Sequence, residues 1–130
     1  MYITIDERDR RPVYQQIVDE IKVLIARGEL QEGSSLPPVR QVASDLGVNL
    51  NTIAFAYRQL QQQGLIKIKH GSGATVVSRK LTKKADEALQ GQLRSALTDL
   101  LLAGLSRTEI IALVMSTLAH LSRREVVKAD

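Results

Sequence analysis

The chain has 130 residues, of which 44% are hydrophobic and 25% are charged, and its formal net charge is +4. This composition excludes a disordered chain and is typical of one globular domain, or of one small domain with an appendage. The lack of cysteine excludes disulfides and thiolate metal sites, and no apolar run reaches the roughly 18 residues of a membrane span. The charged N-terminus lacks the apolar core of a secretory signal, so we expect a cytoplasmic protein.

The first predicted helix spans residues 12–27 and follows residues 2–6, which are predicted to form a short strand or an extended arm. Pro12 suits the first helical position, because its ring fixes φ and its missing N–H is not needed there. The apolar side chains of one helical face recur every three or four residues: Tyr14, Ile17, Ile21 and Leu24. Gly28 is the predicted C-cap.

Two further helices are predicted after a polar loop over residues 28–38. The first spans residues 38–46 and ends at Gly47. Asn49 is the predicted N-cap of the next helix, because its side-chain oxygen can accept a backbone N–H of the first turn, and Gly64 ends that helix. A helical wheel places four residues on its buried stripe, with the tyrosine hydroxyl at the rim of the core: Ile53, Ala56, Tyr57 and Leu60.

Residues 65–78 are predicted to form a hairpin, because an alternating LIKIK run, an HGSG turn and a β-prone ATVVS run follow one another. The rest of the chain is rich in leucine and alanine, which predicts helices over residues 82–103 and 107–124 with a glycine break between them. Ser106 and Glu109 have the S-x-x-E spacing of a capping box, which favours a helix start at this point.

The predicted fold class is therefore mainly α. It consists of an N-terminal winged helix-turn-helix with a two-stranded β-wing over residues 1–80 and a C-terminal helical hairpin over residues 81–130. In a winged helix-turn-helix the third helix enters the major groove with its N-terminus first. Asn49, Asn51 and Thr52 lie at that end, where Asn can form paired hydrogen bonds with adenine and Thr can contact phosphate.

Charge supports the same interpretation. The stretch from residue 34 to residue 80 contains a single acid and six basic residues: Arg40, Arg58, Lys67, Lys69, Arg79 and Lys80. Such a stretch has a positive potential, which suits nucleic acid, an anionic membrane surface or an acidic protein, and charge alone does not separate these partners.

The span from Pro12 to Val77 resembles the winged-helix domain of the GntR family of bacterial transcription regulators. The matching motifs are, in chain order, P-V-Y-Q-Q-I at 12–17, G-x-L-x-x-G-S-x-L-P at 28–37, V-R-Q-V-A at 39–43, L-G-V-N-x-N-T at 46–52, A-Y-R-x-L at 56–60, G-L-I at 64–66 and G-x-G at 71–73. The short helical tail resembles that of the YtrA subgroup, in which a small helical dimerisation unit stands in place of a ligand-binding domain.

The resemblance implies DNA contacts by Arg40 in the second helix, by Asn51 and Thr52 in the third, and by His70 and Gly71 at the wing tip. With the basic residues and the rest of the wing turn added, the candidate DNA-binding residues are Arg40, Asn49, Asn51, Thr52, Arg58, Lys67, Lys69, His70, Gly71, Ser72 and Gly73.

The tail is expected to form a homodimer, because a hairpin of two helices cannot bury both of its apolar faces by itself. The candidate dimerisation residues recur at helical spacing: Leu89, Leu93, Leu97, Leu100, Leu101, Ile110, Leu113, Val114 and Leu118. A symmetric dimer reads two half-sites, which predicts a palindromic operator.

We therefore expect a sequence-specific DNA-binding transcription regulator, acting as a repressor. The sequence has no H-x-x-x-H pair, Gly-rich phosphate loop or serine elbow, so no enzymatic activity, cofactor or metal is expected. The expected partners are double-stranded operator DNA and a second copy of the chain, without a membrane, and the sequence identifies no small-molecule effector. The competing hypothesis is a winged-helix adaptor that binds an acidic protein.

Overall fold

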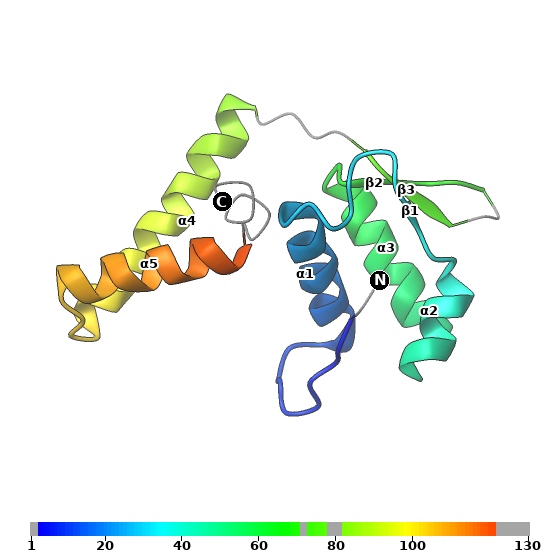
Figure 1. The fold of residues 1–130 in the computed structure, drawn as a ribbon, viewed down its shortest axis with the longest axis horizontal. Helices are drawn as coiled ribbons and strands as arrows, with labels where there is room; N and C mark the ends of the chain where they lie inside the picture. Colours follow the sequence, from blue (N-terminus) through cyan, green and yellow to red (C-terminus); the bar gives the residue numbers. More distant parts are fainter. Residues whose placement is uncertain (1–2, 71–72, 78–81, 122–130) are drawn as a thin grey trace, which may run out of the picture. The chain divides into compact units, whose positions relative to one another are not determined.

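The computed structural model describes residues 3–70, 73–77 and 82–121 (Figure 1). The chain divides into two compact units, Met1–Arg79 and Lys80–Asp130. The described elements are α1 Val13–Ala26, β1 Ser35–Leu36, α2 Val39–Leu46, α3 Leu50–Gln62, β2 Ile66–Ile68, β3 Ala74–Val76, α4 Lys83–Leu102 and α5 Arg107–Leu121. The last three residues of the helix predicted over 107–124 lie outside the described residues.

The N-terminal segment is an extended arm and not a strand. Ile3 and Ile5 are partly buried against the core of the first unit. Gln16 of α1, which is only 4% exposed, holds the arm through both ends of its amide. Its Oε1 accepts from the Asp6 N–H at 3.0 Å, and its Nε2 donates to the carbonyls of Asp6 at 3.3 Å and Arg11 at 3.2 Å. The buried amide is therefore satisfied, and the arm is tied to the helix.

Both ends of α1 differ by one residue from the prediction. Pro12 is the N-cap and not the first helical residue, since its ψ of 149° is not helical. At the other end Arg27 is the C-cap, and Gly28 follows it with a φ of 80°. The prediction that Gly28 is the cap is wrong by one position, because the glycine supplies the left-handed residue just beyond the cap.

The core of the first unit is built around α3, which packs against α1, α2 and β2. Its predicted buried stripe is confirmed, since Ile53, Ala56, Tyr57 and Leu60 are all 0% exposed. Figure 1 shows α1 and α3 side by side. The other elements contribute the rest of the core: Ile17, Val18, Ile21, Leu36, Val42, Ala43, Leu65, Ile66, Ala74 and Val76.

The sheet has three antiparallel strands in the order β1-β3-β2, and not the two that we predicted. The additional strand, β1, lies inside the predicted loop and pairs Ser35 with Thr75 and Leu36 with Ala74. Two residues are too few to show an alternating pattern, so the strand exists only through its pairing with β3. The approach is close: a Cβ on Gly73, which has a φ of 86°, would lie 3.2 Å from the Leu36 carbonyl oxygen.

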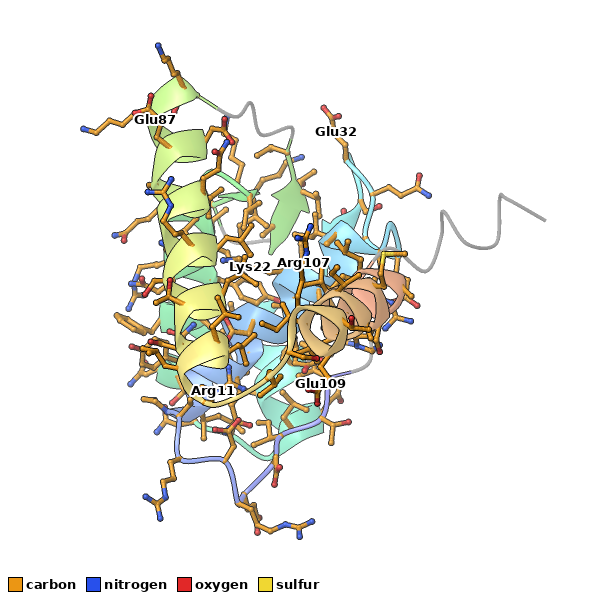
Figure 2. The ribbon with its side chains drawn as sticks, turned by 90° about the vertical axis from the view of Figure 1, so that its left-hand side faces the viewer. Arg11, Lys22, Glu32, Glu87, Arg107 and Glu109 are labelled. Atoms are coloured by element: carbon orange, nitrogen blue, oxygen red, sulfur yellow. The ribbon has the colours of Figure 1, made fainter. Side chains whose placement is uncertain are left out.

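In the second unit both helix starts are capped by side chains. Thr82 accepts from the Ala85 N–H at 3.1 Å at the start of α4. The predicted capping box of α5 is confirmed: Ser106 Oγ accepts from the Glu109 N–H at 3.1 Å, and the Glu109 carboxylate accepts from the Ser106 N–H at 2.9 Å. The Ser106 backbone hydrogen bond lowers the pKa of Glu109, which Figure 2 shows at the start of α5.

Tyr57 generates the first prediction. Its buried hydroxyl donates to the Pro37 carbonyl at 2.7 Å, and burial raises its pKa to about 12 from 10.0. Because the folded-state pKa lies above the unfolded one, its stabilising contribution is complete below about pH 10 and is lost as the pH rises through about 12. We expect Tyr57→Phe to lower the free energy of unfolding by about 1 kcal/mol at neutral pH.

The difference between wild type and Tyr57→Phe should then shrink from pH 10 to pH 12. Urea unfolding at a series of pH values measures it. A difference that stays constant across this range would show that the hydroxyl is not buried as described.

Candidate nucleic-acid interface

The turn between α2 and α3 is short, and hydrogen bonds cap both helix ends that it joins. Gly47 is the C-cap of α2 in the left-handed conformation, with a φ of 65°, and the Val48 N–H donates to the Ala43 carbonyl at 3.0 Å. The side chain of Asn49 then accepts from the Asn51 N–H at 2.8 Å, so the predicted N-cap is confirmed. One oxygen of Asn49 is therefore used to start α3.

Asn51 and Arg58 lie on the same exposed side of α3. Seven residues at 3.6 per turn bring them back to within about 20° of each other, two turns apart along the axis. Both are exposed, and this side is opposite to the buried stripe. Thr52 is half-buried and lies about 100° around the helix from Asn51, so it belongs to a different side of α3.

Two hollows lie between α2, α3 and the wing, and we call them together the wing groove. One is lined by Pro38, Val39, Arg40, Tyr57, Ile68, Lys69 and Gly73. The other shares three of these residues and is lined by Val39, Ala54, Tyr57, Arg58, Gln61, Ile68 and His70.

The wing groove gathers five of the predicted DNA-binding residues from α2, α3 and the wing turn: Arg40, Arg58, Lys69, His70 and Gly73. No acidic residue is among the described residues that line it. Cations on walls without acids give a surface that attracts an anionic polymer.

Lys67 lies apart from these residues. It is exposed on β2 between Ile66, which is buried, and Ile68, which lines the wing groove. Because successive side chains of a strand point to opposite faces, Lys67 points away from the face that carries Ile68. The predicted wing residues Gly71 and Ser72 lie outside the described residues.

Three contacts of α3 were not predicted. Phe55, to which the sequence assigned no role, meets the Tyr14 ring edge-on with centroids 4.7 Å apart, and the Arg58 guanidinium lies 5.8 Å from its centroid. The spacing of three residues between Phe55 and Arg58 could have indicated the cation–π pair. Gln61 Oε1 accepts from the Ile68 N–H at 2.7 Å, and no local pattern indicates this contact.

The candidate dimerisation residues differ in exposure. Those that remain exposed in the single chain are Leu89, Leu93, Leu101, Leu113 and Leu118. Leu97, Leu100 and Val114 are half-buried, and Ile110 is buried. Three further large apolar residues of α4 and α5, which were not predicted to take part in dimerisation, are exposed: Leu102, Ile111 and Met115.

No described helix has both the length and the apolar character needed to cross a membrane. In the described part of the chain, no three His, Asp or Glu side chains are grouped so that they could hold a metal ion.

Comparisons with known proteins agree with this geometry. Residues 13–76 match the family described as "Bacterial regulatory proteins, gntR family". Over 110 residues the chain is 33% identical to the HTH-type transcriptional repressor YtrA of Bacillus subtilis, a match that covers 78% of this chain and 81% of that protein. The chain belongs to the gntR family. It falls in the YtrA subgroup, because this match extends over most of both proteins.

Solved structures support the same fold for this gntR-family chain. A transcriptional antiterminator from Listeria monocytogenes has a TM-score of 0.85 and 31% identity, and the match covers 93% of this chain and 92% of that one. YtrA from Sulfolobus acidocaldarius, a GntR-family transcription factor, has a TM-score of 0.63 and 38% identity over 74% of this chain and 97% of that one. The predicted winged helix with C-terminal helices is confirmed, with a third strand in the wing sheet.

A DNA complex is also among the similar structures. The DNA-binding domain of AraR, solved with the operator ORX1, is 25% identical with a TM-score of 0.53, over 59% of this chain and 96% of that one. The gntR-family chain is a DNA-binding transcription regulator and not an enzyme, as predicted. The adaptor hypothesis is not favoured.

Proposed function

We propose that this gntR-family regulator is a cytoplasmic repressor that binds a palindromic operator as a homodimer. The observation that carries the proposal is the wing groove, whose described lining residues include Arg40, Arg58 and Lys69 and no acidic residue. The repressor assignment is supported by the name of the similar Bacillus subtilis protein.

Base readout in this proposal belongs to the start of α3. Asn51 is exposed and its side chain has no part in the helix cap, so its amide is available for paired hydrogen bonds to a base edge. Asn49 contributes chiefly by capping, because its oxygen already accepts the Asn51 N–H. Thr52, at the helix N-terminus, suits a phosphate contact.

Backbone contact belongs to the wing groove. Arg40, Arg58 and Lys69 would neutralise phosphates on either side of the base-reading helix, and His70 leads into the wing turn. Gly71 and Ser72 retain the wing-tip role that the family resemblance implies. The close approach of Gly73 to β1 accounts for a glycine at this position, so a DNA contact is not needed to explain it.

Dimerisation belongs to α4 and α5. Leu89, Leu93 and Leu101 are exposed on one side of α4, and Leu113 is exposed on α5. So many exposed leucines on two helices are uncommon on a protein that stays monomeric. Burial against the same surface of a second copy would give the two-fold symmetry that a palindrome requires.

The Asn51→Ala variant tests base readout. On the operator, identified by footprinting the DNA upstream of the protein's own gene, we expect a loss of roughly 1 to 3 kcal/mol in binding free energy. On a scrambled duplex the loss should be much smaller. Asn49→Ala is the matched control: losing the cap should cost about 1 kcal/mol of stability and weaken both complexes alike. Equal losses on both duplexes for Asn51→Ala would exclude it as a sequence reader.

Salt titrations test the backbone contacts. Arg40→Ala and Lys69→Ala should each weaken binding to every duplex and reduce the slope of log K against log salt by about 1. Lys67→Ala removes the same charge from a residue that does not line the wing groove, so its slope should equal that of the wild type. A changed slope for Lys67→Ala with unchanged slopes for the other two would place the DNA outside the wing groove.

Light scattering tests the dimer. The full chain should have twice the monomer mass, and residues 1–80 alone should be monomeric. Leu93→Glu should dissociate the dimer, because it places a charge in the buried surface, whereas Ser95→Glu, at an exposed position on the other side of α4, should leave it intact. A monomeric full-length protein would rule out the symmetric-operator proposal.

A further inference from the structure

β2 is an edge strand of the wing sheet, with β3 on one side only. Its register pairs Ile66 with Val76, Lys67 with Thr75 and Ile68 with Ala74. The Lys69 N–H donates to the Gly73 carbonyl at 2.9 Å, and the Val77 N–H to the Leu65 carbonyl at 3.0 Å. Because hydrogen-bonded pairs alternate in an antiparallel ladder, Ile68 belongs to a non-bonded pair and its N–H points away from β3.

Gln61 of α3 supplies the hydrogen-bond acceptor that the sheet does not offer to the Ile68 N–H. Its Oε1 accepts from the Ile68 N–H at 2.7 Å, a contact between the last turn of α3 and the last residue of β2. Ile68 is followed directly by Lys69 and His70, which line the wing groove together with Gln61 itself. The hydrogen bond therefore joins α3 to the point where the wing turn begins.

We propose that Gln61 is a positioning residue that sets the separation between the recognition helix and the wing cations. The inference rests on the proposed function, in which α3 and the wing groove contact DNA together. Two surfaces that grip one duplex bind more tightly when their spacing is fixed before binding, because less conformational entropy is lost on association. Gln61 acts by holding Lys69 at that spacing.

Hydrogen exchange of the Ile68 amide in the free protein tests the tether. Gln61→Met keeps the length and apolar stem of the side chain but has no acceptor, so we expect the amide to exchange about two- to fivefold faster. Gln61→Glu keeps an acceptor oxygen and should keep the slow exchange. Gln62→Met is the matched control, because Gln62 is exposed on α3 and its side chain makes no hydrogen bond with the described residues.

A double-mutant cycle on operator binding tests the positioning role. Gln61→Met should weaken binding about two- to fivefold, and combining it with Lys69→Ala should add little, because both changes act through the same wing contact. Combining it with Arg40→Ala should give additive losses, since Arg40 is carried by α2, which the Gln61–Ile68 hydrogen bond does not join. If Gln61→Met only destabilised the domain, its effect on binding free energy would combine in the same way with Lys69→Ala and with Arg40→Ala.

Two results would overturn the inference while leaving the proposed function intact. One is an Ile68 amide whose exchange is unchanged in Gln61→Met. The other is faster exchange with operator affinity unchanged, or with losses that add fully to those of Lys69→Ala. If the wild type binds no duplex sequence-specifically, the proposed function fails and the positioning role with it, and the exchange experiment still shows whether the tether exists.

Discussion

Burial of one side of α3 is the constraint on which the first unit depends. Ile53, Ala56, Tyr57 and Leu60 are fully enclosed by α1, α2 and the wing sheet. Rotating the helix about its axis would expose these apolar side chains to water and bury polar ones. Both changes cost free energy. Packing of the buried stripe therefore keeps the opposite side of α3, which carries Asn51, facing solvent.

The same helix also places its neighbours. The Tyr57 hydroxyl donates a hydrogen bond to the Pro37 carbonyl, just before α2. One turn later, the Gln61 side chain accepts a hydrogen bond from the Ile68 N–H at the end of β2. These two side chains relate the recognition helix to both elements that flank it. The wing groove is the consequence, since its two hollows are bounded by residues from α2, α3 and the wing. Its charge comes from side chains that are neighbours only in the folded unit.

The second unit follows a different rule. Its helices begin with local caps at Thr82 and Ser106, which need no tertiary contact. Many of its leucines remain exposed, in contrast to the enclosed core of the first unit. Local stability with unburied apolar surface suits the proposed homodimer, in which these helices would complete their packing with another copy.

The sequence by itself determined the helices, their caps at Asn49 and Ser106, and the buried stripe of α3, because these features depend on residues a few positions apart. It also named the cations of the wing groove, although it grouped Lys67 with them. Only the tertiary structure decided the strand β1, the Gln61–Ile68 bond, the separation of Lys67, and the meeting of Arg40 with Lys69. Each of these depends on backbone segments that are brought together by the core, and no local pattern records such a pairing.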